Sequence, residues 1–135
     1  MSNITQVVNV EKNMTTFKRG LHASDLDQLL SSAGPFTVFA PSDLAFGKLE
    51  AGIIESLLKA ENKIKLNEML NHHVVAGKIS FKDLKDGDKL KSLNGKQLSV
   101  KVDNATVSVD GATIQNRDVA TSNGVIHSLD AVLKN

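Results

Sequence analysis

Three closely spaced turn signals in the second half of the chain constrain the fold more than any other feature. Each signal is a dipeptide whose members tolerate a positive φ, which is the backbone requirement of a tight β-hairpin. The dipeptides are Asn94-Gly95, Asp103-Asn104 and Asp110-Gly111. The β-branched runs that they separate predict strands over 89–93, 97–102, 106–109 and 113–119. Strands joined by such short turns pair with their sequence neighbours, so we expect an antiparallel meander.

The first half of the chain carries helix signals instead. Polar residues that favour helix N-termini precede three apolar, helix-spaced segments within residues 3–34. These candidate caps are Asn3, Asn13 or Thr15, and Ser24. Residues 36–40 predict a buried strand, and the apolar periodicity predicts further helices over 53–58, 63–71 and 80–84. With two more β-branched runs at 72–76 and 125–133, this segregation indicates one α+β domain over residues 1–135.

The composition is that of a folded globule, and it excludes several classes of protein. Hydrophobic residues make up 41% and charged residues 23% of the chain. A nucleic-acid interface needs a basic surface or stacking aromatics, but the net charge is +1 and Trp and Tyr are absent. No apolar run reaches the roughly 18 residues of a transmembrane helix. Because cysteine is also absent, disulfides, thiol nucleophiles and thiolate metal sites are excluded.

Two segments resemble the two signature motifs of the fasciclin domain family. They are residues 36–46, FTVFAPSDLAF, and residues 123–133, NGVIHSLDAVL. Between them, residues 70–77 (LNHHVVAG) are similar to the family's Tyr-His segment, and the order and spacing agree over essentially the whole chain. The resemblance implies a fasciclin-like fold, with a helical layer packed on a wedge of two mainly antiparallel β-sheets. It also implies an adhesion or matrix module rather than an enzyme.

The resemblance implies a location outside the cytoplasm. Family members are usually secreted or anchored at a surface, and many carry the domain in tandem. The N-terminus lacks the basic-then-apolar pattern of a signal peptide. We therefore expect a secreted, periplasmic or cell-surface domain, peripheral to the membrane, whose signal sequence is not part of this chain. A cysteine-free chain with one copy of the domain is typical of a bacterial member.

The first motif is expected to be structural. Pro41 ends a strand where a helix begins, and Ser42 or Asp43 can then cap that helix. The alternative is an anion or ligand site at the same helix start. Across all the motifs, the residues that we expect to be structural are Thr37, Pro41, Ser42, Asp43, His73, Asn123, Gly124 and His127.

The second motif is also expected to be structural. Asn123-Gly124 is interpreted as a turn in which the glycine admits a positive φ. In the strand that follows, alternation places His127 on the same face as Val125 and Leu129. A histidine among apolar neighbours predicts a buried core residue rather than a metal ligand.

Adjacent histidines at positions 72 and 73 invite a metal hypothesis, which the spacing disfavours. A helical zinc pair needs residues i and i+4, and neighbours in a strand face opposite ways. We therefore expect no metal site and no cofactor. His73 matches the family's histidine, which implies a buried ring that is hydrogen-bonded near the first motif. His72 occupies the family's tyrosine position, which is linked to adhesion in animal members, so it is a binding candidate without implying the same recognition.

A second binding candidate precedes the second motif. Residues 116–119 (NRDV) are similar to an Asn-Lys-Asp-Ile stretch of animal adhesion members, and Asp118 and Val119 align with the Asp-Ile pair proposed there as an integrin contact. An exposed carboxylate beside an apolar side chain can bridge to a cation that a partner holds. The alternative is a strand end that carries a charge.

The sequence predicts a non-catalytic module for adhesion or protein interaction. G-x-S-x-G, Gly-rich phosphate loops and H-E-x-x-H are all absent. The partner would be a protein of a matrix or cell surface, or a second copy of the chain. With no Trp or Tyr and two Arg, one contact would be weak and would rely on multivalency. The alternative is a small-molecule or glycan-binding module, which a deep, dry pocket would favour over a flat apolar patch.

Overall fold

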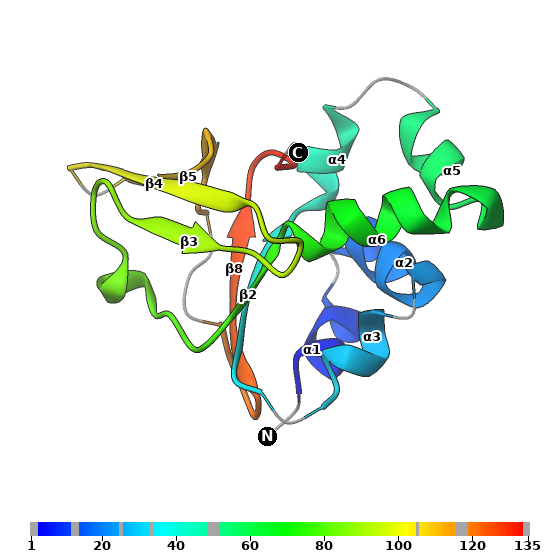
Figure 1. Ribbon diagram of the computed structural model, residues 1–135, viewed down its shortest axis with the longest axis horizontal. Helices are drawn as coiled ribbons and strands as arrows, with labels where there is room; N and C mark the ends of the chain where they lie inside the picture. Colours follow the sequence, from blue (N-terminus) through cyan, green and yellow to red (C-terminus); the bar gives the residue numbers. More distant parts are fainter. Residues whose placement is uncertain are drawn as a thin grey trace.

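The computed structural model describes residues 3–11, 14–24, 26–32, 34–48, 52–104, 106–115 and 119–133. Its elements lie in three layers, with the helices on one side, a central sheet in the middle and an outer sheet on the other side (Figure 1). The α-helices are α1 (Ile4–Val10), α2 (Thr15–Ser24), α3 (Leu26–Leu29), α4 (Asp43–Gly47), α5 (Ile53–Leu57) and α6 (Lys63–Asn71). Two 3-10 helices are η1 (Ala60–Asn62) and η2 (Phe81–Asp83). Within the described ranges, no helix is both long enough and apolar enough to span a bilayer.

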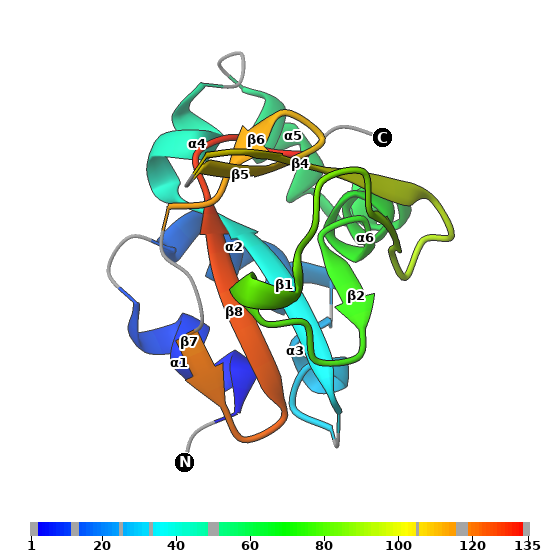
Figure 2. The same ribbon diagram turned by 90° about the vertical axis from the view of Figure 1, so that its left-hand side faces the viewer.

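The central sheet has the strand order β2-β1-β8-β7. Its strands are β1 (Phe36–Pro41), β2 (Val74–Ala76), β7 (Val119–Thr121) and β8 (Gly124–Leu129). β1 and β8 pair in parallel from Phe36 opposite Gly124 to Pro41 opposite Leu129, and the two outer pairings are antiparallel. Figure 2 shows β1 and β8 side by side along their whole length. The strands of the two signature motifs thus lie against each other.

The outer sheet is an antiparallel meander in the order β3-β4-β5-β6. Its strands are β3 (Lys89–Lys91), β4 (Gln97–Asp103), β5 (Thr106–Val109) and β6 (Ala112–Thr113). The three turn signals are confirmed, since Gly95 has a φ of 87°, Asn104 one of 56°, and Asp110 and Gly111 values of 48° and 87°. A bridge between Val75 and Ser92 joins the edge strands of the two sheets.

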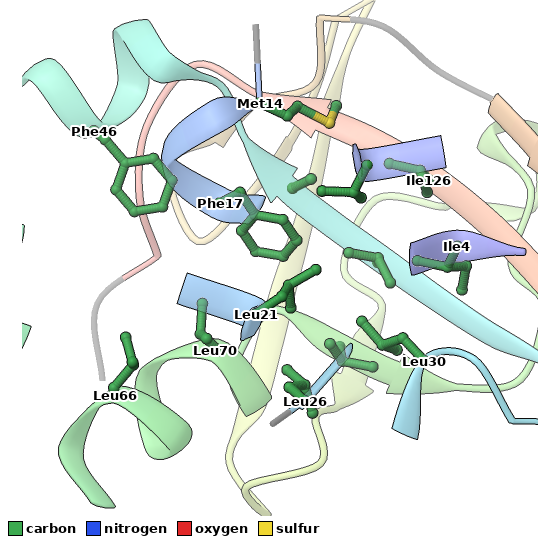
Figure 3. Close-up of a cluster of buried hydrophobic side chains, with 14 residues drawn as sticks. Ile4, Met14, Phe17, Leu21, Leu26, Leu30, Phe46, Leu66, Leu70 and Ile126 are labelled. Carbon is green, nitrogen blue, oxygen red and sulfur yellow. The ribbon is translucent and has the colours of Figure 1, made fainter. Parts of the chain in front are cut away.

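Two hydrophobic clusters fill the spaces between the layers. One lies between the helices and the central sheet, and it is shown in Figure 3 with Phe17, Leu21 and Ile126 among its members. The other lies between the two sheets and includes Phe39 and Leu129. Successive residues of a strand point to opposite faces, so one sheet serves both clusters. The predicted α+β architecture of a helical layer on two sheets is confirmed.

Several predicted boundaries are wrong. Pro41 is the last residue of β1 rather than a stop before it, and residues 72–73 form the turn after α6 instead of the start of a strand. The strand predicted over 113–119 is two strands, β6 and β7, in different sheets. The run over 125–133 is a strand only as far as Leu129. Asn3 caps α1 with a capping box, as predicted, whereas Asn13 lies outside the described residues.

Candidate functional site

Ser42 and Asp43 divide the capping of two helices between them. The Ser42 hydroxyl accepts a 3.3 Å hydrogen bond from the N–H of Ala45 and caps α4, as predicted. Asp43 turns instead to α2, where its carboxylate accepts 2.8 Å bonds from the N–H of Thr16 and the hydroxyl of Thr15. Partial burial raises the pKa of Asp43, but the bonds from Thr16 and Thr15 outweigh it and bring the pKa below its ordinary value. The alternative of an anion site at the start of α4 has no support here, because the first residue of that helix is itself an anion.

Thr37 and His127 hold one loop between them. The Thr37 hydroxyl donates to the carbonyl of Gly77 at 2.7 Å and accepts from the N–H of Ile79 at 2.8 Å. The His127 ring lies 2.9 Å through Nε2 from the carbonyl of Ile79, and it stacks on Phe39 with ring centroids 5.7 Å apart. Both side chains are fully buried, as expected for structural motif residues. The loop that follows β2 is therefore fixed from beneath by the central sheet.

The imidazole of His73 links α6 to the end of the chain. The ring is fully buried, and its Nδ1 lies 2.7 Å from the carbonyl of Met69 while its Nε2 accepts a 2.9 Å bond from the N–H of Leu133. These partners select the neutral form with the proton on Nδ1. Burial lowers the pKa of His73 from 6.5 to about 4, with a raising effect from the Met69 bond and a lowering one from His72. The predicted burial is confirmed, but the expectation that the ring is hydrogen-bonded near the first motif is wrong, because its partners are Met69 and Leu133, which belongs to the second motif. Only the backbone of His73 reaches the first motif, where its carbonyl accepts from the N–H of Phe39.

His72 is buried rather than displayed. Its Nδ1 lies 3.4 Å from the Asn94 side-chain oxygen, and its Nε2 lies 3.7 Å from a carboxylate oxygen of Asp110. That Nε2 atom has no hydrogen-bond partner among the described residues. The rings of His72 and His73 are nearly perpendicular with centroids 6.3 Å apart. Across the described part of the chain, no three His, Cys, Asp or Glu side chains gather as a metal site would need. His72 therefore lies behind the surface, where it supports Asn94.

Asn123 joins three segments through one side-chain amide. Its NH₂ group donates to the carbonyls of Leu30 and Ser32 at 2.6 and 2.8 Å. Its oxygen accepts from the N–H of Ile4 at 3.0 Å and from the hydroxyl of Thr121 at 3.3 Å. The start of α1, the segment after α3 and β7 thus meet at a single residue.

A glycine is needed at position 124 because no side chain fits there, and not because the backbone adopts a positive φ. The predicted turn is present, at residues 122–123 between β7 and β8, but the predicted positive φ at Gly124 is wrong, since its φ lies outside the positive range. A Cβ atom at this position would overlap the backbone carbonyl oxygen of Phe36 in the neighbouring strand β1. The first residue pair of the parallel β1–β8 ladder is therefore too close for any side chain.

Of the two residues that align with the adhesion pair, Asp118 and Val119, the structure describes only Val119. Asp118 lies outside the described residues. Val119 is half-buried in β7, pairs with Ile126 and packs on the cluster beneath the helices. Nearby, Gln115 lines an open hollow of about 440 Å³ with Lys48 and Leu44, whose side chain is 80% exposed.

A larger groove lies between the edge strands of the two sheets. Beyond the Val75–Ser92 bridge, β2 and β3 separate and leave a groove of about 740 Å³. Its residues are Val75, Ala76, Ile79, Lys89, Leu90, Lys91, Ser92, Leu93, Asn94 and Gly95. Ile79 belongs to the loop that Thr37 and His127 fix, and Asn94 belongs to the cluster around His72. The motif residues thus shape the groove from behind without lining it.

The sequence predictions did not include this groove. The one sequence feature that points toward it is the Lys89-Leu90-Lys91 triplet, because a short strand with alternating lysines is typical of the edge of a sheet. Which strand lies opposite that edge depends on a bridge between residues of different sheets, and no local pattern encodes it.

Comparisons with known proteins place this geometry in context. The family model described as Fasciclin domain matches residues 12–135. This chain is similar to Protein sll1483 of Synechocystis sp. (strain ATCC 27184 / PCC 6803 / Kazusa), with 45% identity over 130 residues, covering 96% of this chain and 72% of the relative. It is also similar to Uncharacterized protein sll1735 of the same strain, with 35% identity over 133 residues and 98% of each chain covered.

A solved structure shares the fold. The FAS1 domain pair from the insect cell adhesion molecule Fasciclin I superposes with a TM-score of 0.88, covering 99% of this chain and 51% of that chain. The sequence identity is 18%, so this likeness establishes the arrangement of helices and sheets.

Proposed function

This chain belongs to the fasciclin domain family, and from that premise we propose that it is a non-catalytic adhesion or protein-interaction module. The family is known for cell adhesion and matrix interaction in eukaryotes, and the solved structural neighbour comes from a cell adhesion molecule. The similarity to the Synechocystis proteins supports a bacterial member. We propose a location outside the cytoplasm, with residues 1–135 acting as one domain.

The observation that carries this proposal is that the cavity beneath the helices is very small, whereas the groove between β2 and β3 is large and open to solvent. The cavity beneath α2, α4 and α6 has a volume of about 10 Å³, which is near the minimum for one water molecule. Small-molecule pockets are typically hundreds of Å³ and bury most of the ligand. The space of about 740 Å³ lies instead in the open groove between β2 and β3. An open, elongated surface of this size suits a segment of a protein better than a small apolar ligand.

The chemistry of the groove also argues against the glycan alternative. Sugar sites usually stack a ring face on an aromatic side chain, and none of the ten described lining residues is aromatic. The lining offers aliphatic side chains, two lysines and the amide of Asn94. Asp118 and Val119 remain proposed contacts, and His72 remains a proposed contributor through its support of Asn94.

Multivalent attachment tests the proposed function. Fluorescent beads coated densely with the domain would be mixed with intact cells of the source organism and with each other, because many copies compensate for a weak single contact. We expect attachment above that of beads coated with an unrelated folded protein of similar size and charge. Sedimentation of the soluble domain over a concentration series then distinguishes homophilic contact from binding to a different protein. Reversible association indicates homophilic contact, and a monomer at all concentrations indicates a heterologous partner.

Two results would contradict the proposal. One is bead attachment no greater than that of the control protein, both to cells and between beads. The other is a stabilising small molecule or oligosaccharide that raises the melting temperature with saturable dependence on concentration, which would favour the ligand-binding alternative.

A further inference from the structure

The groove between β2 and β3 offers a backbone edge as well as side chains. The N–H of Val100 donates to Asp88, and the N–H of Ser92 donates to Lys96, each at 2.9 Å. In an antiparallel pair the backbone groups of successive residues point alternately toward and away from the partner strand. Positions 88 and 92 face β4, so the backbone N–H and C=O of Lys89 point the other way, toward the groove. An extended chain lying there can pair with this edge.

The side chains of the groove combine apolar contact with positive charge. Val75 is buried, Ile79 and Leu90 are half-buried, and Leu93 is 37% exposed. The charged residues of the lining are Lys89 and Lys91, both exposed. Between described residues, no ion pair joins either lysine to a carboxylate.

The carboxylates that precede β3 are held in other hydrogen bonds and form no ion pair with these lysines among the described residues. The three acidic residues that precede β3 each accept a hydrogen bond from a backbone N–H of their own surroundings. The pairs are Asp83 with Ser80 at 3.3 Å, Asp86 with Val102 at 2.9 Å, and Asp88 with Lys85 at 3.0 Å. The groove therefore keeps a positive rim along β3.

This charge pattern disfavours a second copy of the chain as the occupant. If two β3 edges paired antiparallel, the Lys89-Leu90-Lys91 segment of one copy would face the same segment of the other. Like charges opposite each other destabilise a strand pair, and lysines on edge strands block edge-to-edge association. The complementary occupant carries negative charge.

We propose that this groove binds an extended segment of a partner protein in which Asp or Glu side chains alternate with aliphatic ones. The carboxylates lie against Lys89 and Lys91, the aliphatic side chains lie against Leu90 and Leu93, and the segment's backbone pairs with the β3 edge. The fixed loop at Ile79 forms the opposite wall. This inference rests on the proposed interaction function and specifies the partner's chemistry.

The direct test uses a short capped peptide that alternates glutamate and valine, flanked by glycines, as the probe. Two-dimensional ¹H–¹⁵N NMR of the labelled domain reports which amides shift during titration. We expect saturable shifts confined to residues 75–79 and 89–95, weakening at least tenfold between about 0.05 M and about 0.5 M salt. The same peptide with lysine in place of glutamate should leave the spectrum unchanged. Equal shifts with both peptides, or shifts outside the groove, would overturn the proposal.

Charge reversal gives the matched variants. Lys89→Glu with Lys91→Glu should weaken peptide binding at least tenfold, while Lys59→Glu with Lys65→Glu, exposed lysines of the helical layer, should bind as the unchanged domain does. Unchanged dispersion of the remaining amide signals verifies that both double variants are folded. Equal binding by both double variants would mean that the β3 lysines serve only to prevent aggregation, and the proposal would be wrong.

The bead experiment separates this inference from the function on which it rests. Attachment that survives Lys89→Glu with Lys91→Glu would leave the adhesion function standing and refute the groove as its site. Specific peptide binding without any bead attachment would support the groove and refute adhesion.

Discussion

The carboxylate of Asp43, the first residue of α4, accepts a 2.8 Å hydrogen bond from the N–H of Thr16 in the first turn of α2. One acidic side chain thereby caps a helix that begins 28 residues earlier, at Thr15, while Ser42 caps its own helix. The two helices are held together at their N-terminal ends, where both backbone dipoles favour a negative charge.

Asp43→Ala should lower the free energy of unfolding by about 1–2 kcal/mol, because α2 loses its cap and the hydroxyl of Thr15 loses its acceptor. Urea unfolding followed by circular dichroism measures the change. Leu44→Ala is the control, since that side chain is 80% exposed and its loss should change stability by less than about 0.5 kcal/mol. Equal effects of the two substitutions would show that the cap contributes nothing.

Gly124→Ala should destabilise the protein by about 3 kcal/mol, because the new methyl group overlaps the carbonyl oxygen of Phe36 and must push β1 and β8 apart. Gly47→Ala is the matched control. A Cβ atom at position 47 meets nothing within 4 Å, so this substitution should leave stability unchanged or raise it by up to about 1 kcal/mol. Thermal unfolding of both variants makes the comparison, and similar melting temperatures would contradict the close approach.

Asn123→Asp changes one atom and should cost roughly 3 kcal/mol at neutral pH. A carboxylate would keep the bonds from Ile4 and Thr121 but would face the carbonyls of Leu30 and Ser32 without a proton to donate. Asn67→Asp, on α6, introduces the same charge elsewhere and should change stability by less than about 0.5 kcal/mol. Denaturant unfolding of both variants tests whether the lost stability comes from the two missing donor bonds or from the added charge alone. Equal losses in the two variants would point to the charge.

Protonation of His73 should destabilise the protein in a defined pH window. In the unfolded chain His73 takes up a proton near pH 6.5, whereas its pKa in the folded state is about 4. The unfolded state therefore binds more protons between these values, so the free energy of unfolding falls as the pH drops from 6.5 to about 4 and His73 adds no further loss below that. The full difference corresponds to roughly 3 kcal/mol.

Urea unfolding between pH 7 and pH 4 measures this loss, with His73→Gln as the comparison. The variant starts less stable but should lack the part of the pH dependence that His73 causes. Asp43 acts separately, because its pKa is lowered and its contribution disappears only as the pH falls below its ordinary value of 3.8. Parallel curves for the two proteins would contradict a buried neutral His73.

Local features of the fold were predictable because single residues determine them. The turn at Asp110-Gly111 follows from two adjacent residues that tolerate a positive φ, and the cap at Asn3 follows from its own side chain. The burial of His127 follows from strand alternation beside apolar neighbours. In each case the residues that make up the predictive pattern lie within a few positions of one another in the chain.

Features that depend on distant pairings were not predictable from pattern. The parallel register of Phe36 with Gly124 explains why the glycine is needed, and a positive φ was the wrong reason. The sequence offered Ser42 or Asp43 as the cap of the helix that follows, and only the packing of α2 against α4 explains why Asp43 caps α2 instead. His72 was a binding candidate because it occupies the family's tyrosine position, but the turn after α6 directs it beneath Asn94.

The parallel pairing of β1 with β8 also has a consequence for biosynthesis. β1 lies between β2 and β8, and its partner residues in β8 come 88 positions later in the chain (Phe36 with Gly124), after every other element of the central sheet. Such a long sequence separation slows folding, because the loop between the strands must be closed before their contacts form. Until Gly124–Leu129 emerge, Val38 and Phe39 lack the neighbouring strand, and neither hydrophobic cluster can be completed. The two hydrophobic clusters of the domain therefore cannot close until β8 has been made.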